Sequence, residues 1–192
     1  MNVLILASSS AYRRMLLEKL RIPFSILSPE IDETPKVDES PVETASRLAR
    51  EKAEKAGIRH PDALIIGCDQ VAVLGEEVIG KPCNFDNAFR QLKMMRGKTV
   101  TFYSALCLYH SGKGSLQSAV VPCEVSFRNY TDAQIENYLN LDEPYHCAGS
   151  AKSEGLGIAL IASMKTEDPN ALVGLPLIAL VDMLKKEGIE VV

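Results

Sequence analysis

The stretch NVLILASSSAYRRMLLEKLRIPFSIL, residues 2–27, decides the fold class. Its first part, Asn2–Ala7, is a short apolar run that predicts a buried strand, and the serines that follow predict a polar turn. The apolar side chains between Met15 and Leu20 fall on one side of a helix, which ends before Pro23. Phe24–Leu27 then predicts a second strand. A strand, a helix and a strand at the start of a chain are typical of an α/β domain.

The rest of the chain continues this alternation of helices and strands. Ser40, Pro41 and Glu43 form a capping box at the start of a helix that extends to about Ala56. The other predicted elements are a strand over 63–74 that is interrupted at Gly67 and resumes after Asp69, a short returning strand at 78–79, a helix over 86–95, a hairpin of strands 99–109 and 116–127, a helix over 131–139, a strand over 157–164 and a helix over 175–186. Both faces of segment 99–109 are apolar, which predicts a central position in a mixed sheet.

Composition and charge argue against several classes of protein. The chain has 192 residues, of which 46% are hydrophobic and 24% charged, and its formal net charge is −4. This acidity argues against a nucleic-acid polymer as partner. No apolar run approaches the roughly 18 residues of a membrane helix, so no membrane association is expected. The N-terminal segment has its apolar residues before its basic ones, the reverse of a secretory signal, which predicts a cytoplasmic protein.

Common catalytic and metal-binding motifs do not occur in the sequence. It has no G-x-x-x-x-G-K-[ST] phosphate loop, no G-x-G-x-x-G and no G-x-S-x-G. The five cysteines include no Cys-x-x-Cys pair, and the three histidines include no pair at ligand spacing. Neither a zinc site nor a disulfide framework is therefore expected.

Cationic side chains lie next to predicted turns. Arg13 and Arg14 follow the serines at 8–10 across the start of a helix. Backbone amides, hydroxyls and guanidinium groups together suit an anion, and the alternative is a solvated first turn. Lys52 lies on a helical stripe of alanine and leucine, and Lys81 lies between a glycine and a proline. These cations are candidates for holding phosphates.

Carboxylates complement these cations. Asp69 stands inside an apolar strand, so its carboxylate must be paired, hydrogen-bonded or metal-bound if it is buried, and a structural salt bridge is the alternative. The loop with Glu30, Asp32 and Glu33 offers oxygen ligands for a hard cation such as Mg²⁺, and a solvated loop is the alternative. Together, the cations and carboxylates suit metal-assisted phosphoryl chemistry on a nucleotide.

An ordered set of short motifs covers almost the whole chain and resembles the Maf family of nucleoside triphosphate pyrophosphatases. The motifs are S-x-S-x-x-R-R from Ser8, the DE turn Asp32–Glu33, REKA at 50–53, GCDQ at 67–70, GKP at 80–82, AGS-x-x-S-E-G at 148–155 and VGLPL at 173–177. The resemblance implies an α/β fold, a single two-lobed domain over 1–192 around an elongated, mixed and twisted sheet flanked by helices, with the site in the cleft between the lobes. Homodimers are common in that family, so a second copy of the chain is a candidate partner.

The resemblance also implies a reaction and roles for particular residues. The family converts a nucleoside triphosphate and water to a nucleoside monophosphate and diphosphate with a divalent metal, Mg²⁺ or Mn²⁺. Asp69 matches the catalytic proton acceptor, and Glu33 matches the carboxylate that positions metal and water, so both would be metal ligands. The residues that match the phosphate-binding set are Ser8, Arg13, Lys52 and Lys81.

Three further positions bear on the base. The branch that acts on dTTP and UTP has arginine, threonine and glutamine where this chain has Tyr12, Gln70 and Glu154, and the branch that acts on 7-methyl-GTP has an aromatic residue, often tryptophan, then glutamine and glutamate. Glu154 can accept hydrogen bonds from N1–H and the 2-amino group of guanine, and Tyr12 can stack on the cationic 7-methylguanine. The resemblance is therefore greatest to the 7-methyl-GTP branch.

Two other functions stay open at this point. One is a pyrophosphatase of the dTTP/UTP type or of broad range, against which Tyr12, Gln70 and Glu154 argue. The other is a nucleotide-binding regulator, for instance of cell division, that requires no turnover; the full set of candidate catalytic residues argues for an enzyme instead.

Overall fold

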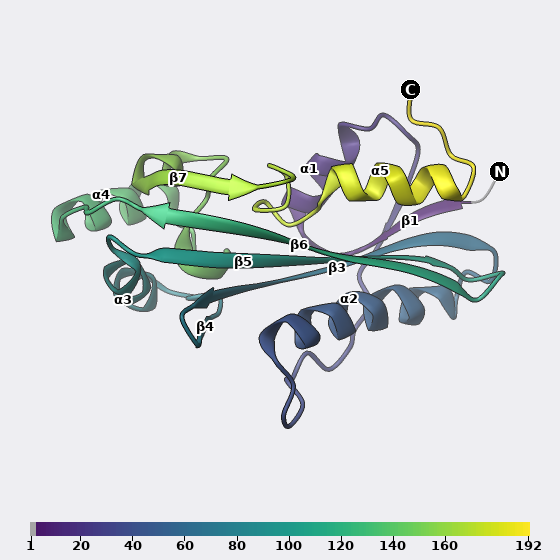
Figure 1. Ribbon diagram of the computed structural model, residues 1–192, viewed down its shortest axis with the longest axis horizontal. Helices are drawn as coiled ribbons and strands as arrows, with labels where there is room; N and C mark the ends of the chain where they lie inside the picture. The colour runs from purple at the N-terminus through teal and green to yellow at the C-terminus, as the bar shows by residue number, and fades with distance from the viewer. Residues whose placement is uncertain (1–2) are drawn as a thin grey trace. The chain divides into compact units, whose positions relative to one another are not determined.

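The computed structural model describes residues 3–192 and contains a mixed sheet flanked by helices (Figure 1). The helices are α1 (Ala11–Glu18), α2 (Pro41–Gly57), α3 (Phe85–Met95), α4 (Asp132–Asp142) and α5 (Leu177–Lys186), with short 3₁₀ helices η1 (Ala148–Ser150) and η2 (Leu156–Leu160). The strands are β1 (Val3–Ala7), β2 (Ser25–Leu27), β3 (Ala63–Leu74), β4 (Glu77–Ile79), β5 (Thr99–His110), β6 (Ser115–Phe127) and β7 (Ile161–Thr166). The predicted α/β class is confirmed; Asn2, the first residue of the predicted first strand, lies outside the described residues.

Strand pairing brings the ends of two parallel strands together. The sheet order is β2-β1-β3-β5-β6-β7, with β4 beside β3. β1 pairs in parallel with β2 and β3, so that Ala7 lies opposite both Leu27 and Gly67. Residues that follow Ala7 and Gly67 therefore lie together beyond the carboxyl end of β1. In α/β proteins, ligands bind at the carboxyl ends of parallel strands. β5 lies between β3 and β6, which confirms its predicted central position.

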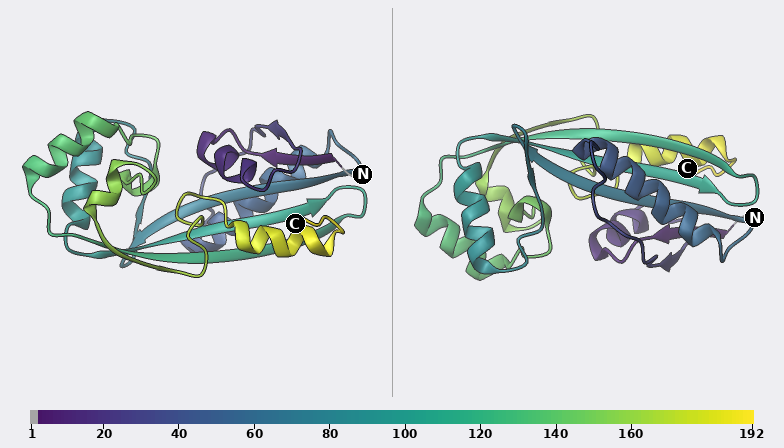
Figure 2. Two further views of the ribbon diagram at one scale, coloured as in Figure 1. Left: turned by 90° about the horizontal axis from the view of Figure 1, so that it is seen from above. Right: turned by 90° about the horizontal axis from the view of Figure 1, so that it is seen from below.

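The chain divides into two compact units. The first contains the chain up to Gln70, Ser104–Val121 and Asp168–Val192, and the second contains Val71–Tyr103 and Pro122–Glu167. In the first unit, α1 and α5 cover one face of the strands and α2 covers the other (Figures 1 and 2). The buried cluster on the α1 and α5 side includes Leu17, Ile66 and Leu180.

Helix α2 lies unusually close to β3 because Gly67 has no side chain. A Cβ at Gly67 would collide with the backbone oxygen of Ala49 and would lie 3.0 Å from Cβ of Ala53. The helix presents small buried alanines to the sheet, including these two. Its start has the predicted capping box, in which the Ser40 hydroxyl accepts from the amide of Glu43 while the Glu43 carboxylate accepts from the amide of Ser40.

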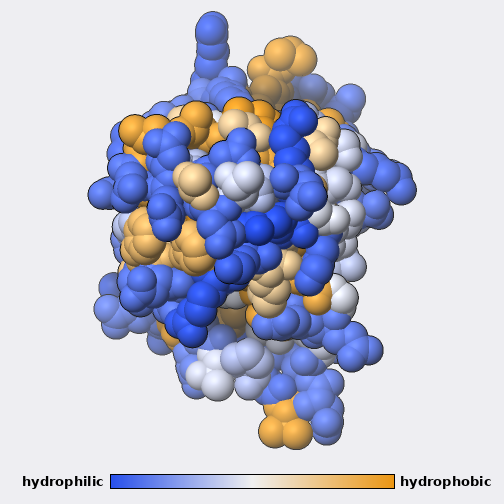
Figure 3. Space-filling model, turned by 90° about the vertical axis from the view of Figure 1, so that its left-hand side faces the viewer, coloured by the Kyte–Doolittle hydropathy of each residue, from blue (hydrophilic) through white to orange (hydrophobic). Residues whose placement is uncertain are grey.

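In the second unit, α3 packs against α4 and η1. The buried Tyr130 donates its hydroxyl proton to the carbonyl of Leu92 at 2.8 Å, which joins the loop between β6 and α4 to α3. Burial raises the pKa of this phenol well above its usual range, so it stays protonated. Figure 3 faces the side of the second unit with α3 and α4, where hydrophilic side chains separate the hydrophobic patches.

Three predicted elements differ from the structure. β3 is continuous through Gly67, because that glycine leaves room for α2 rather than interrupting the strand. The predicted strand over 157–164 is instead η2 followed by β7: a Cβ at Gly157 would lie 2.6 Å from the oxygen of Lys152, so the chain folds back tightly there. The predicted helix from Leu175 begins at Leu177, where the carboxylate of Asp168 accepts from the amide of Ile178 at 2.7 Å.

Among residues 3–192, no helix combines the length and the apolar character that crossing a lipid bilayer requires.

Candidate functional site

Lys52 joins two carboxylates in the first unit. Its Nζ lies 2.7 Å from Oδ1 of Asp69 and 2.7 Å from Oε1 of Glu33. Lys52 is only 8% exposed because it is on the face of α2 that packs on β3. Asp69 is two residues beyond Gly67 on the same face of β3, so the close approach at Gly67 puts Lys52 within reach of Asp69. The structure thus brings together three of the predicted site residues.

The acidic loop before α2 is ordered by Arg47, a residue that the sequence did not single out. The Arg47 guanidinium donates to both carboxylate oxygens of Glu39, at 2.7 and 2.8 Å, and to the carbonyl of Thr34 at 3.1 Å. A third nitrogen donates to Glu51 at 3.1 Å. These contacts fasten to α2 the part of the loop that follows Glu33. Glu33 itself is exposed, and its part as a metal ligand stays a prediction.

The Arg47–Glu39 pair stays ionised over a wide pH range. Hydrogen bonds from Arg47 lower the pKa of Glu39 from 4.5 to about 2. Because the folded pKa is lowered, the contribution of this pair to stability is full above the ordinary glutamate pKa and is lost as the pH falls through about 2. The loop should therefore keep its conformation throughout the neutral range.

Replacing Arg47 by methionine should release this loop and with it Glu33. If Glu33 has the role that the Maf resemblance implies, kcat/KM for a nucleoside triphosphate should fall by roughly 10–100-fold, since a misplacement of about 1 Å at a catalytic group has effects of this size. Arg47→Lys should lose activity as Arg47→Met does, because an ammonium cannot make the bidentate contact with Glu39. Steady-state kinetics check this.

The control for Arg47 is Arg50→Met. Arg50 is on the same helix but is exposed, and its ion pair among the described residues is with Glu54 one turn away, at 3.5 Å. It should retain activity close to that of the unmodified chain. Equal kinetic losses in the two methionine variants would contradict the role given to Arg47.

Arg13 and Ser8 lie together at the start of α1. The Arg13 Nε donates to the carbonyl of Gly174 at 2.9 Å, and its Nη1 donates to the carbonyl of Cys68 at 2.9 Å and to the hydroxyl of Ser8 at 3.4 Å. Ser10 caps the helix by accepting from the amide of Arg13. Arg13 is thus a fixed cation that ties β3 and the loop before α5 to the end of β1, and a phosphate would have to bind at its Nη2.

The thiol next to this site is not a nucleophile near neutral pH. Cys68 is fully buried, and its burial raises the pKa of the thiol to about 11. It therefore stays protonated, and it packs as a small apolar side chain in the buried cluster.

Gln70 contacts the loop before α5 through its side-chain amide, and its predicted part in base selectivity stays a prediction. Its Nε2 lies 2.9 Å from the hydroxyl of Ser104, 3.0 Å from the carbonyl of Ala171 and 2.9 Å from that of Leu172. The fully buried Ser104 hydroxyl donates in turn to Ala171 at 2.6 Å. Gln70 and Ser104 together fix the loop that leads into α5. The carbonyl of Gly174 in this loop also accepts the hydrogen bond from Arg13.

The remaining predicted residues lie as follows. Tyr12 is half-buried beside Arg13 on α1 in the first unit. Lys81 and Glu154 are exposed residues of the second unit. Lys81 lines a hollow of about 270 Å³ there, together with Arg90 and Asn87. A part for Lys81 and Glu154 in the same site as Asp69 stays a prediction.

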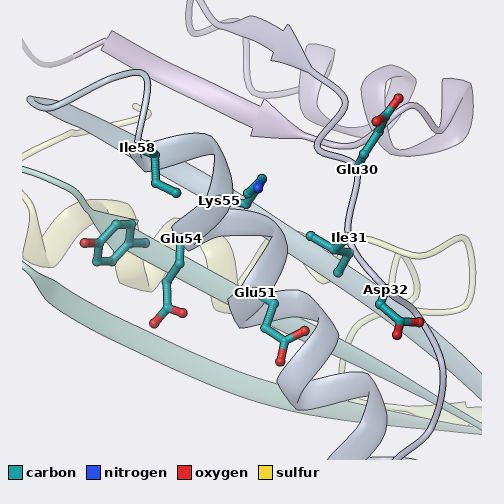
Figure 4. A pocket seen from close by; sticks show the side chains of 8 residues that line it. Glu30, Ile31, Asp32, Glu51, Glu54, Lys55 and Ile58 are labelled. Atoms are coloured by element: carbon teal, nitrogen blue, oxygen red, sulfur yellow. The ribbon is translucent and has the colours of Figure 1, made fainter.

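Two other acidic residues of this loop line a separate hollow. Glu30 and Asp32 line a hollow of about 610 Å³ with Glu51 and Glu54 of α2 (Figure 4). Lys55 is its one cationic lining residue in the described part of the chain. Of the three predicted ligand carboxylates, only Glu33 forms an ion pair with Lys52 among the described residues.

Comparison with known proteins assigns the family. The family model described as "Maf-like protein" matches residues 3–187. This chain belongs to the Maf family. It is 58% identical over 192 residues to a 7-methyl-GTP pyrophosphatase of Methylobacillus flagellatus, covering 100% of both chains. It is 57% identical to a protein of the same name from Nitrosospira multiformis, covering 98% of this chain and 96% of the relative. A third, from Thiobacillus denitrificans, is 54% identical, with 98% and 94% covered.

The Maf resemblance in the sequence is therefore confirmed, and the geometry adds residues that it missed. Arg47, Ser104 and Gly174 hold the loops on which the candidate residues lie. The pattern Val173–Leu177 contained the signal for Gly174, whose φ of +114 favours glycine. Arg47 and Ser104 had no signal, because an arginine in a charged helix and a serine in a strand are both common.

Proposed function

We propose that this Maf protein hydrolyses 7-methyl-GTP to 7-methyl-GMP and diphosphate. The observation that carries the proposal is the buried Lys52 between Asp69 and Glu33, which puts two carboxylates and a cation at one point. Support for the substrate comes from the names of the relatives, which are 54–58% identical over nearly their full length. The free thiols of all five cysteines, which lie within the described residues, favour a reducing compartment such as the cytoplasm.

Asp69 and Glu33 would hold Mg²⁺ or Mn²⁺. Their carboxylates fit such an ion because one oxygen of each already contacts the same cationic nitrogen. Hard oxygens are the ligands that these ions prefer, and Mg²⁺ commonly binds through one or two carboxylates and substrate phosphates. A bound divalent ion supplies charge neutralisation of the phosphates and acidifies water.

The chain's own residues would perform the remaining steps. Asp69 accepts a proton from water as the water oxygen bonds to the α-phosphorus and the bond from that phosphorus to the bridging oxygen breaks. The diphosphate then leaves with the electron pair of that bond. Lys52, Arg13 and Lys81 offset the charge of about −4 on the triphosphate, and Ser8 donates a hydrogen bond to it.

Base selectivity would come from Tyr12, Gln70 and Glu154 in different ways. Tyr12 offers a ring face to the cationic 7-methylguanine, and Glu154 accepts from its N–H groups. The amide of Gln70 already donates to the loop before α5, so Gln70 acts by fixing that loop. Ser104 supports Gln70 from within the core.

Replacing Glu154 by glutamine should lower kcat/KM for 7-methyl-GTP by roughly 10–100-fold, because charge-assisted hydrogen bonds contribute about 1.5–3 kcal/mol. Turnover of UTP should be unchanged, since a pyrimidine has no such pair of donors. The matched control is Glu136→Gln, an exposed glutamate of α4 in the same unit. An equal loss for both nucleotides would refute the role of Glu154.

The test of the function itself is a panel of nucleotides. Diphosphate release should be fastest with 7-methyl-GTP among 7-methyl-GTP, GTP, UTP and dTTP, with Mg²⁺ or Mn²⁺ present. Equal turnover of UTP would favour a broad-range pyrophosphatase. Tight binding without hydrolysis, measured by calorimetry, would favour a regulator instead.

A further inference from the structure

Lys52 stands where the proposed metal ligands meet. Its ammonium contacts Asp69 Oδ1 and Glu33 Oε1, each at 2.7 Å. The lysine is buried on α2, which packs directly on β3, so its backbone cannot move away without disturbing the core. The free protein thus has a monovalent cation on the two oxygens that a divalent cation would use.

These two kinds of cation compete at this point. An oxygen in contact with an ammonium has given one of its acceptor positions to that group, and a divalent ion nearby would be repelled by the ammonium charge. Screening of this repulsion by water is limited, because Lys52 is only 8% exposed. A divalent ion binding alone would also leave the buried ammonium without its partners, which is unfavourable.

A triphosphate removes this conflict. Its oxygens can accept from the Lys52 ammonium, which has a flexible four-carbon stem and three rotatable donors. The two carboxylates are then released to the divalent ion, and the phosphates complete its oxygen ligands. Glu33 can adjust to the new partner because its side chain is 57% exposed, whereas Asp69 is fixed in β3.

We propose that Lys52 is the resident counter-ion of the Asp69–Glu33 pair, and that the divalent metal gains both carboxylates only when the nucleotide draws Lys52 away. The inference rests on the proposed nucleotide pyrophosphatase function. Metal and nucleotide then bind with positive coupling, and each raises the affinity of the other by the same factor. Lys52 thus makes tight binding of the divalent metal depend on the nucleotide, in addition to contacting phosphate.

Mn²⁺ binding to the full chain tests the proposal without turnover. Free Mn²⁺ is measured by electron paramagnetic resonance, with and without the α,β-methylene analogue of 7-methyl-GTP, and with a protein-free blank for the Mn²⁺–nucleotide complex. The unmodified protein should bind Mn²⁺ alone at least tenfold more weakly than with the analogue. Lys52→Met should bind Mn²⁺ alone at least tenfold more tightly than the unmodified protein.

Two further variants make the result specific. Lys186→Met removes an exposed lysine of α5 in the same unit and should leave Mn²⁺ affinity unchanged. Lys52→Met combined with Asp69→Asn should lose the tight binding, which separates this site from the acidic hollow at Glu51. Mn²⁺ alone should also raise the unfolding temperature of Lys52→Met more than that of the unmodified protein.

A measurement on the unmodified protein covers the case in which Lys52→Met does not fold. The side-chain ¹⁵N signal of Lys52 should keep its position when Mg²⁺ alone is added and should shift when Mg²⁺ and the analogue are added together. Equal Mn²⁺ affinity with and without the analogue, or no gain in Lys52→Met, would overturn the proposal. Failure of the proposed function is a different result: no diphosphate released from any nucleotide.

Discussion

Replacing Asp69 by asparagine should lower kcat for 7-methyl-GTP by about 10²–10⁴-fold, the usual contribution of a general base. The fold should be retained, because the asparagine Oδ1 can still accept from the Lys52 ammonium, which now lies 2.7 Å from the carboxylate. Lys52 also keeps its contact with Glu33. Diphosphate release measures the loss, and circular dichroism checks the fold.

The control for this change is Asp182→Asn. Asp182 is an exposed aspartate of α5 in the same unit, so the substitution removes the same charge away from Lys52. It should keep the activity of the unmodified protein. Full turnover by a folded Asp69→Asn variant would remove Asp69 from the mechanism.

Adding one methyl group at Gly67 should destabilise the protein by at least about 3 kcal/mol, at the upper end of the range for overpacked cores. The new Cβ would collide with the backbone oxygen of Ala49, which cannot turn away as a side chain can. For a chain of this length, the unfolding temperature should fall by roughly 6–12 °C. Activity should fall too, because moving α2 outward takes Lys52 away from Asp69.

Gly80→Ala is the matched control for Gly67→Ala. A Cβ at Gly80 would meet no atom of the described residues within 4 Å, so its unfolding temperature should stay near that of the unmodified protein. Differential scanning calorimetry compares the two variants. A Gly67→Ala protein as stable as Gly80→Ala would contradict the close packing of α2 on β3.

Local sequence patterns predicted the elements that are stabilised locally. The capping box of Ser40 and Glu43 is an interaction between neighbours in the sequence, and α2 begins where it predicted. Gly67 shows the limit of such patterns. A glycine in an apolar run indicates a break or a close approach equally well, and only the position of α2 decides between them.

The candidate site depends even more on contacts between distant residues. Lys52 and Asp69 were linked by resemblance to a family, since spacing alone does not show that they meet. Arg47 looks like one more charge on a polar helix, and it is partly buried because the loop with Glu39 folds back onto it. Gln70 reaches carbonyls about a hundred residues further along, which no local pattern could have shown.

The proposed reaction directs water to the α-phosphorus of 7-methyl-GTP. Hydrolysis in ¹⁸O-labelled water, followed by mass spectrometry of the products, tests it most directly. We expect the label to enter 7-methyl-GMP and the other product to be unlabelled diphosphate. Label in diphosphate or in inorganic phosphate, or no hydrolysis of 7-methyl-GTP, would contradict it.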